Sequence, residues 1–516
     1  MSIIFVGVII FSAIIVIKYS EPVSNFFKQI ARDGTYKAIK SSKNIQISKK
    51  NKEMLRIGQM VELRDMLENQ QFKKLNNILE EYQNNFEKDQ TEEYKIYDAF
   101  HAFSITDSSY EESFETWIND FPDNYQPYLA LAHYYYAKGW ESRGYKFIDE
   151  TSKEQLDRML FYFLKSEENL RIALKMNPHL LSGYELLIGI YNATGNDAAE
   201  DAVIEKALTL FPYSFLIRSC MIWAKQPRWG GSYSAMEKIA KEAERYADIN
   251  PELTLLYGFI YIDQGRILER RKKYEEALKF YTKALTFGDH WSFYCERAKI
   301  YLFDLHEYDR ALENINRCIE LRPTKDEIYL LRSRIYFAKG SYRDSLDELE
   351  TTELIKPDDP STKKWKLWAS KNLLNRGHRL FKTDLHAAIE KYDLSISFDN
   401  DNSESYYWRG LASYKIKDFE SALSDFNRAI EINPYHFESY RMADYILAKD
   451  KQWDTIREYW NRFIELEPDH AEAYLERAGT NYHNKDFASA LDDFEKSCDL
   501  GNEEACKRYN QLKTRL

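Results

Sequence analysis

The sequence predicts an all-α fold: a solenoid, or superhelix, of antiparallel helix pairs behind a single N-terminal transmembrane helix. Three observations carry this prediction: a 34-residue period of turn residues, few helix breakers, and one long charge-free segment. The turn residues that keep the period, on either side of one interruption, are Pro323, Pro357, Asn400, Pro434, Pro468 and Asn502. Only 18 Gly and 12 Pro stand beside 39 Tyr and 29 Phe, which supply bulky side chains for helix packing. A period of this length is typical of a repeated helix pair that packs on its neighbours.

The N-terminal segment from Ile3 to Ile17 contains no charged residue and only Ser12 as a polar one. Such a run is either a secretion signal or a membrane anchor. No basic residue precedes it, and no small-residue cleavage site follows it. The pattern therefore favours an uncleaved anchor over residues 1–19.

Residues 20–52 form a basic tether in this interpretation. Nine basic residues occur from Lys18 through Lys52, against Glu21 and Asp33 alone. Because basic residues beside a membrane span mark the cytoplasmic side, we expect a single-pass membrane protein with a cytoplasmic C-terminal solenoid. The plain alternative is a solvated, flexible tether, and both interpretations can hold together.

Residues 53–250 are predicted to be a helical domain with irregular repeats of the same period. Pro178 and Pro212 lie 34 residues apart, and Ala173 and Ala207 each stand five residues earlier. A small residue at the same place in both copies indicates a close helix crossing.

Local signals set three boundaries along the chain. A helix that begins near Gln126 is expected to stop at Lys138–Gly139. Ser232 stands where its side chain can cap a helix that begins at Tyr233. The 34-residue phase slips around Pro360 to Trp368, where we expect an extended loop or a longer helix.

Residues 251–516 carry the repeat explicitly. Its best copy consists of Gly410, Tyr414, Phe419, Ala422, Phe426, Ala429 and Pro434, and Ala478, Tyr482 and Phe487 return 68 residues after the first three. Small residues are needed where the two helices of a repeat approach closely, and aromatic residues fill the space between repeats. This pattern resembles the tetratricopeptide repeat (TPR). The resemblance implies an α-solenoid that holds a protein or peptide partner on its concave face.

A second set of residues lies upstream: Trp117, Phe121-Pro122, Arg143-Gly144, Asn177-Pro178 and Trp229-Gly230-Gly231-Ser232. With this set, residues 100–250 resemble an uncharacterised domain of bacterial proteins that precedes or contains TPR-like repeats. The resemblance implies a bacterial source and no established activity.

Cys498 and Cys506 stand eight residues apart, across the end of one predicted helix and the start of the next. The segment that joins them resembles Sel1-like repeats, which implies that cysteines so spaced bridge the two helices in secreted relatives. A disulfide needs an oxidising compartment, whereas the basic tether indicates the cytoplasm. We therefore expect two reduced thiols, with the bridged pair as the alternative.

No residue pattern indicates catalysis. The ten histidines are scattered, and none stands at metal-ligand spacing to another histidine or to a cysteine. Motifs for nucleophilic hydrolysis, phosphoryl transfer and dinucleotide binding are missing from the sequence. The net charge of -11 argues against nucleic-acid binding. We predict no enzyme, no cofactor, no metal, no nucleic acid and no small-molecule substrate.

The first helix of each repeat is expected to meet the partner through repeat offsets 2, 5, 9 and 12. Drawn from these offsets, the candidate partner-binding residues are Arg334, Phe337, Tyr407, Tyr414, Arg441, Tyr445 and Tyr482. Aromatic and Arg side chains dominate protein interfaces, although any single tyrosine has an equal claim to pack between repeats. The predicted function is a membrane-anchored, non-catalytic scaffold.

Two other classes of function stay open. One is an exported or cell-surface solenoid with Cys498 and Cys506 bridged. The other is an enzyme within residues 100–250, which would need a cleft where Trp140, Arg143 and Trp229 converge with titratable groups.

Overall fold

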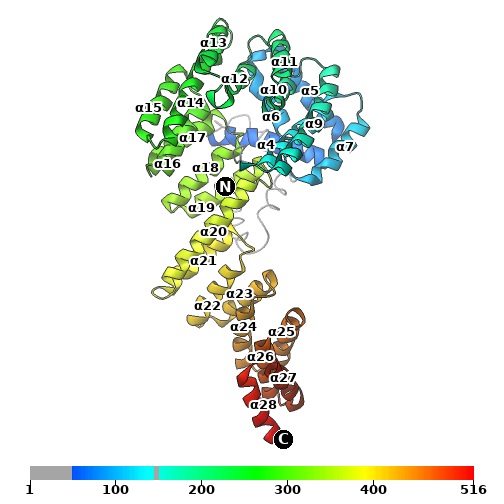
Figure 1. Ribbon diagram of the computed structural model, residues 1–516, viewed down its shortest axis with the longest axis vertical. Helices are drawn as coiled ribbons and strands as arrows, with labels where there is room; N and C mark the ends of the chain where they lie inside the picture. Colours follow the sequence, from blue (N-terminus) through cyan, green and yellow to red (C-terminus); the bar gives the residue numbers. More distant parts are fainter. Residues whose placement is uncertain (1–48, 145–149, 516) are drawn as a thin grey trace, which may run out of the picture. The chain divides into compact units, whose positions relative to one another are not determined.

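The computed structural model describes residues 49–144 and 150–515, which form 25 α-helices and no strand (Figure 1). The prediction of an all-α fold is confirmed. Two compact units make up the chain: unit 1 comprises residues 1–335 and 351–357, and unit 2 comprises residues 336–350 and 358–516.

Unit 1 is built from helices that pack mainly on their neighbours along the chain. They are α4 (Lys49–Glu68), α5 (Phe72–Lys88), α6 (Glu93–His101), α7 (Glu111–Asp120), α8 (Tyr125–Arg143), α9 (Lys153–Met176), α10 (Leu181–Thr194), α11 (Asp197–Leu210), α12 (Phe215–Ala224), α13 (Tyr233–Glu244), α14 (Leu256–Arg270), α15 (Tyr274–Ala284), α16 (Trp291–Phe303) and α17 (Tyr308–Leu321). Each of α18 (Asp326–Lys339) and α19 (Tyr342–Ile355) contributes residues to both units. The strongest pairs are α8 with α9, α14 with α15 and α16 with α17.

Side-chain caps begin several helices where the sequence places a serine. The Ser232 hydroxyl accepts a hydrogen bond from the Ala235 N–H and starts α13 at the predicted residue. Ser152 and Gln155 form a reciprocal capping box at the start of α9. Such caps satisfy N–H groups of the first turn and each stabilises a helix by about 1 kcal/mol.

α8 continues to Arg143, past Lys138–Gly139 where the sequence predicts its end. Gly139 has a packing role instead, because a Cβ there would lie 2.5 Å from ring atoms of Phe163 on α9. The glycine marks a close approach of two helices and not the end of one.

Contacts between distant parts of the sequence hold unit 1 together. The Arg322 guanidinium lies 2.6 Å from an Asp98 carboxylate oxygen of α6, and Arg64 of α4 donates a 2.8 Å hydrogen bond to the Ile355 carbonyl. Both arginines are buried. Removing one partner of a buried charged pair is costly, so the Arg322–Asp98 pair holds the end of α17 against α6 within unit 1.

Unit 2 continues with α20 (Pro360–Leu380), α21 (Leu385–Phe398), α22 (Ser403–Lys415), α23 (Phe419–Ile432), α24 (Phe437–Lys449), α25 (Trp453–Leu466), α26 (Ala471–His483), α27 (Phe487–Asp499) and α28 (Glu503–Arg515). The break in the 34-residue period around Pro360 is explained by the longer helix α20. Pro360 lies in its first turn, and the Asp359 side chain caps it. Proline is tolerated there because the first N–H groups of a helix have no partner within it.

Equivalent ion pairs recur in unit 2 at twice the repeat length. Arg409 binds Asp425 through two N–H groups at 2.9 and 2.6 Å. Arg477 binds Asp493 with the same two distances, 68 residues later. The recurrence shows that the two helix pairs, α22 with α23 and α26 with α27, have the same internal geometry.

The localisation prediction, a single-pass membrane protein with a cytoplasmic solenoid, is contradicted. Across residues 49–144 and 150–515, no helix combines the length and apolar character that a membrane span needs. The longest, α9, has 24 residues but carries charged side chains along its whole length, as a helix with one solvated face does. The predicted anchor itself, residues 1–19, lies outside the described residues.

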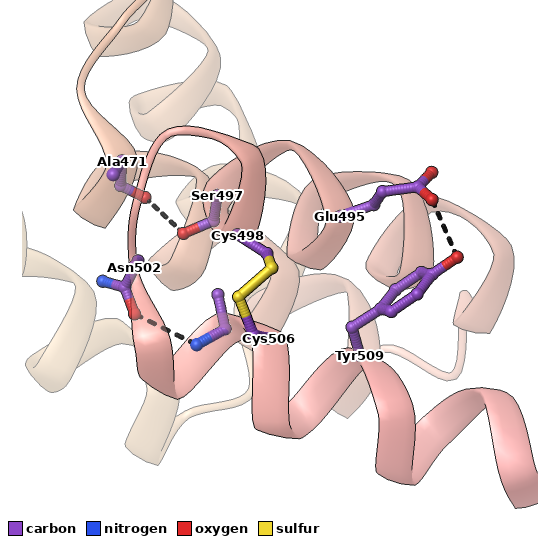
Figure 2. The surroundings of a disulfide bond; sticks show 8 residues. Ala471, Glu495, Ser497, Cys498, Asn502, Cys506 and Tyr509 are labelled. Carbon is purple, nitrogen blue, oxygen red and sulfur yellow. Dashed lines mark hydrogen bonds between the residues drawn. A yellow bond between two sulfur atoms is a disulfide. The ribbon is translucent and has the colours of Figure 1, made fainter.

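A disulfide joins Cys498 at the end of α27 to Cys506 in the first turn of α28, with Cα atoms 4.7 Å apart (Figure 2). The expectation of two reduced thiols is therefore wrong, and the bridge that the Sel1-like resemblance implied is present. Beside it, the Ser497 hydroxyl donates to the Ala471 carbonyl at 2.7 Å. The expectation failed because it depended on a compartment inferred from the tether and ignored how closely the two helix ends approach.

Candidate functional site

The candidate site lies on the first helices of three successive repeats in unit 2, namely α22, α24 and α26. We call it the first-helix face and define it by repeat offsets 2, 5, 9 and 12: Glu404, Tyr407, Leu411, Tyr414, Glu438, Arg441, Tyr445, Ala448, Glu472, Leu475, Gly479 and Tyr482. Residues at these spacings share one side of a helix. Five of the seven predicted partner-binding residues belong to it.

Two tyrosines of the first-helix face are exposed. The Tyr445 side chain is 56% exposed and the Tyr482 side chain 37%. The ring of Tyr445 meets that of Tyr414 edge-on, with centroids 5.8 Å apart. Single exposed aromatic residues are ordinary, whereas exposed rings that share one face make that face a candidate interaction surface.

Lys449 joins this aromatic group, one position beyond the offsets read from the sequence. Its ammonium lies 3.8 Å from the ring centroid of Phe419, 4.9 Å from that of Tyr414 and 5.1 Å from that of Tyr445. A cation over aromatic faces is attracted by their negative charge density. Reading offset 13 beside offset 12 would have found this lysine.

Tyr407 is held by packing and is less available to a partner. Its ring lies 5.9 Å from that of Phe426 and 4.8 Å from that of His436. His436 also lies 3.3 Å from a Glu404 oxygen, and this hydrogen bond lowers the pKa of Glu404. These contacts support the alternative in which Tyr407 packs between repeats and does not meet a partner.

Arg441 stands between carboxylates of two neighbouring repeats. It lies 3.2 Å from an oxygen of Glu438 on its own helix and 3.5 Å from one of Glu476 on α26. Burial and the charge of Asp444 raise the pKa of Glu476, while Arg441 lowers it. Burial also raises the pKa of Asp444 to about 6. On α24 and α26 the first-helix face itself carries Glu438 and Glu472 against Arg441.

The other two predicted partner-binding residues do not belong to this face. Phe337 is 3% exposed and packs edge-on against Tyr342, Trp365 and Phe398. Arg334 lies in unit 1, where its guanidinium is 6.0 Å from the ring centroid of Phe303. We leave both out of the site, because their offsets are those of a repeat whose helix α18 contributes to both units.

A buried carboxyl group joins α6 to the start of α12 in unit 1. Glu93 of α6 accepts hydrogen bonds from the Ser214 hydroxyl at 2.6 Å and from the Phe215 N–H at 2.7 Å, at the start of α12. Burial raises the pKa of Glu93 to about 8, although these hydrogen bonds oppose the shift. A carboxyl group of α6 thus caps the first turn of α12.

Unit 1 also holds a polar cavity of about 460 Å³. Residues that line it include Arg56, Tyr94, Asp98, Glu252, His290 and Arg322. Trp140, Arg143 and Trp229, which the enzyme alternative requires to converge, do not line this cavity. Arg143 instead lies 5.8 Å from the Trp140 ring centroid, and Trp229 is exposed.

Comparison with protein families shows that the chain contains tetratricopeptide repeats. Tetratricopeptide-repeat profiles match residues 260–287, 292–325, 403–436 and 453–505. A profile for a domain of unknown function, DUF4034, matches residues 59–161. The chain is thus an all-α protein with TPR repeats and an N-terminal DUF4034 domain. The TPR resemblance is confirmed, and the resemblance to an uncharacterised domain is confirmed as well, although the match begins at residue 59 and overlaps residues 100–250 only as far as residue 161.

Solved structures of several TPR proteins are similar at low identity. YrrB, described as a TPR protein with an unusual peptide-binding site, is 18% identical over 45% of this chain and 97% of its own, with a TM-score of 0.21. Yeast Tom70 is 13% identical over 86% of this chain and 96% of its own, with a TM-score of 0.26. The TPR2AB domain of yeast Sti1 in complex with pHSP90 is 17% identical over 47% and 98%, with a TM-score of 0.21. Because these TM-scores are low, we base no further argument on the likenesses.

Proposed function

We propose that unit 2 binds an extended peptide segment of a protein partner on its first-helix face, without catalysis. The observation that carries the proposal is the row of tyrosines at repeating offsets, in which Tyr445 and Tyr482 are exposed. Aromatic side chains are the residues that most often dominate binding energy at protein interfaces. An extended peptide suits this face, because equivalent positions recur from helix to helix.

The charged groups of the face support the same function. Arg441, half-exposed between Glu438 and Glu476, can exchange these carboxylates for groups of a partner. Pairs with solvent access contribute little to folding stability, so their exchange costs the protein little. The first-helix face differs from other exposed aromatic positions because its tyrosines recur at equivalent offsets of successive repeats.

The test is retention of a randomised, biotinylated octapeptide pool by the full chain. Replacing Tyr445 and Tyr482 together by alanine should lower retention by about tenfold or more, because truncating one interface anchor costs about 2 kcal/mol. Tyr435→Ala is the matched control, since Tyr435 is 57% exposed but lies in the turn before α24. Equal retention by the double variant and the wild type would refute the proposed face.

A second candidate concerns where the solenoid acts. The Cys498–Cys506 disulfide favours an exported or cell-surface solenoid, because disulfides persist in oxidising compartments and are rare in reducing ones. Cells that make the full chain can be quenched in acid and alkylated with a maleimide under denaturing conditions. Both cysteines should escape the label until a reductant is added. Complete labelling without reductant would contradict the exported setting.

A further inference from the structure

Gly479 has no structural reason to be glycine. It lies in the interior of α26, outside the left-handed region of backbone conformation, and a Cβ added to it would meet no atom within 4 Å. At other helical glycines, such as Gly377 and Gly410, a Cβ would collide with a neighbouring ring. Glycine inside a helix is less favourable than alanine because it loses more conformational freedom on folding. The missing side chain at Gly479 therefore points to a requirement outside the fold.

The repeat shows what is missing. In the step from α22 to α24, Tyr414 at offset 12 meets Tyr445 at offset 9 of the following repeat, with ring centroids 5.8 Å apart. One period later, in the step from α24 to α26, the same two offsets hold Ala448 and Gly479. A pair of rings in one step is thus replaced by the two smallest side chains in the next. We call this position the notch and define it by Ala448 and Gly479.

Each residue of the notch has an exposed tyrosine one turn away on its own helix. Tyr445 lies one turn before Ala448 on α24, and Tyr482 lies one turn after Gly479 on α26. Aromatic rings prefer edge-on or offset contacts with other rings. A ring brought by a partner would take the place at the notch that the Tyr414 and Tyr445 rings fill one step earlier.

The charges near the notch determine which peptide residues are favoured next to the aromatic residue. The flanking helices carry Glu438, Glu472 and Glu476 against Arg441 and Lys449, and Arg441 is shared between Glu438 and Glu476. Asp444 accepts a hydrogen bond from the Trp460 indole N–H, and Arg477 is paired with Asp493, so neither is counted. The excess of carboxylates favours basic over acidic neighbours in a bound peptide, since unlike charges attract and like charges repel.

We propose that the notch accepts an aromatic side chain of an extended peptide whose flanking residues are basic. The proposal rests on the proposed function of the first-helix face and adds the class of residue that it selects. The glycine and alanine leave the room, the neighbouring tyrosines supply the contacts, and the carboxylates set the preferred flanks.

The test uses the full chain and biotinylated octapeptides with the fourth residue fixed as Phe, Leu or Glu and all others randomised. The wild type should retain the Phe pool about two- to tenfold better than the Leu pool, the range that an aromatic pair contributes beyond its buried area. Sequencing of the retained Phe pool should show Lys and Arg enriched over Asp and Glu. The Glu pool should be retained least.

Gly479→Tyr fills the notch with the residue that the preceding repeat carries at the same offset, so the preference for Phe over Leu should disappear. Asp492→Tyr adds the same ring on the exposed side of α27 and should keep the preference. Thermal unfolding of both variants distinguishes a filled notch from a damaged fold, and Gly479→Ala provides a smaller filling that the structure accommodates freely.

Three results would overturn the inference. A preference for Phe that persists in a folded Gly479→Tyr variant would place the selecting site elsewhere. Equal retention of the Phe and Leu pools by the wild type would refute aromatic selection while leaving the proposed function standing. Failure of the wild type to retain any pool above bare resin would refute the proposed function, and the inference with it.

Discussion

Glu93 is a buried carboxyl group whose proton is linked to the stability of unit 1. Its folded pKa is about 8 because of burial, above the ordinary value of 4.5. For a group with a raised folded pKa, the stability that comes from binding the proton is complete below the ordinary pKa. It is lost as the pH rises through the folded pKa. The affected window therefore runs from about pH 4.5 to pH 8.

Glu93→Gln should remove this pH dependence, because the amide keeps the shape of the carboxyl group but does not ionise. Chemical denaturation at several pH values should show the wild type losing stability relative to the variant between about pH 5 and 8, by a few kcal/mol. His133 and His290, whose pKa values burial lowers to about 3, give the opposite slope in both proteins and cancel in the difference. Parallel pH profiles would contradict the assignment.

Some properties of single residues could be predicted from the sequence and others could not. That the tyrosines at offsets 9 and 12 share one side of a helix could be predicted, because the 34-residue period fixes their spacing. The burial of Phe337 could not, because its neighbours Trp365 and Phe398 lie on elements whose spacing breaks the period. The notch at Gly479 needed the structure, since only a position with room for a Cβ separates it from glycines required by packing.

At the scale of helices, the same substitution should have opposite effects at two glycines of unit 2. Gly479→Ala should stabilise the unit by about 0.5–1 kcal/mol, the usual advantage of alanine in a helix. Gly377→Ala should destabilise it by about 1–3 kcal/mol, because a Cβ there collides with the buried ring of Tyr392. Urea denaturation of the two variants measures both. A loss of stability at Gly479 would mean that its helix face is filled within the protein itself.

The last helix should depend on the disulfide. Bridging Cys498 and Cys506 closes a short loop, and in the chain-entropy account such a bridge stabilises by about 2–3 kcal/mol. A reductant should therefore speed hydrogen exchange in α28, while α22 to α26 stay protected. The Cys498→Ser, Cys506→Ser double variant should exchange equally fast with and without reductant. Unchanged protection of α28 after reduction would show that packing of Ala505 and Leu512 suffices.

Helix existence was easier to predict than helix ends. Around Pro360 the sequence is compatible with either an extended loop or a longer helix. The structure has the longer helix α20, in which Pro360 lies in the first turn, where proline is tolerated. In the sequence Gly139 indicates a helix end, but in the structure it allows α8 and α9 to pack closely. Glycine serves both purposes because it has no side chain. The sequence alone does not show whether another helix packs against the glycine, so it cannot distinguish the two roles.

At the scale of the whole molecule, the period predicts helix pairs but not how distant pairs meet. The Arg322–Asp98 and Arg64–Ile355 contacts join residues more than two hundred positions apart, which no repeat spacing encodes. These contacts place the C-terminal helices of unit 1 with its N-terminal helices.

The separation into units gives a prediction about function. Glu93→Gln alters the interior of unit 1, so it should leave retention of the octapeptide pools unchanged at neutral pH. The same assay that detects loss at Tyr445 and Tyr482 measures this. Equal losses from a unit 1 substitution and from the tyrosine variant would refute the assignment of binding to unit 2.

The central claim is that the first-helix face of unit 2 is the binding surface. Hydrogen–deuterium exchange of the full chain, with and without a saturating octapeptide taken from the retained Phe pool, tests it most directly. Protection should increase in α22, α24 and α26, with little change in α4 and α6. Protection confined to unit 1, or to the second helices α23, α25 and α27, would contradict the claim.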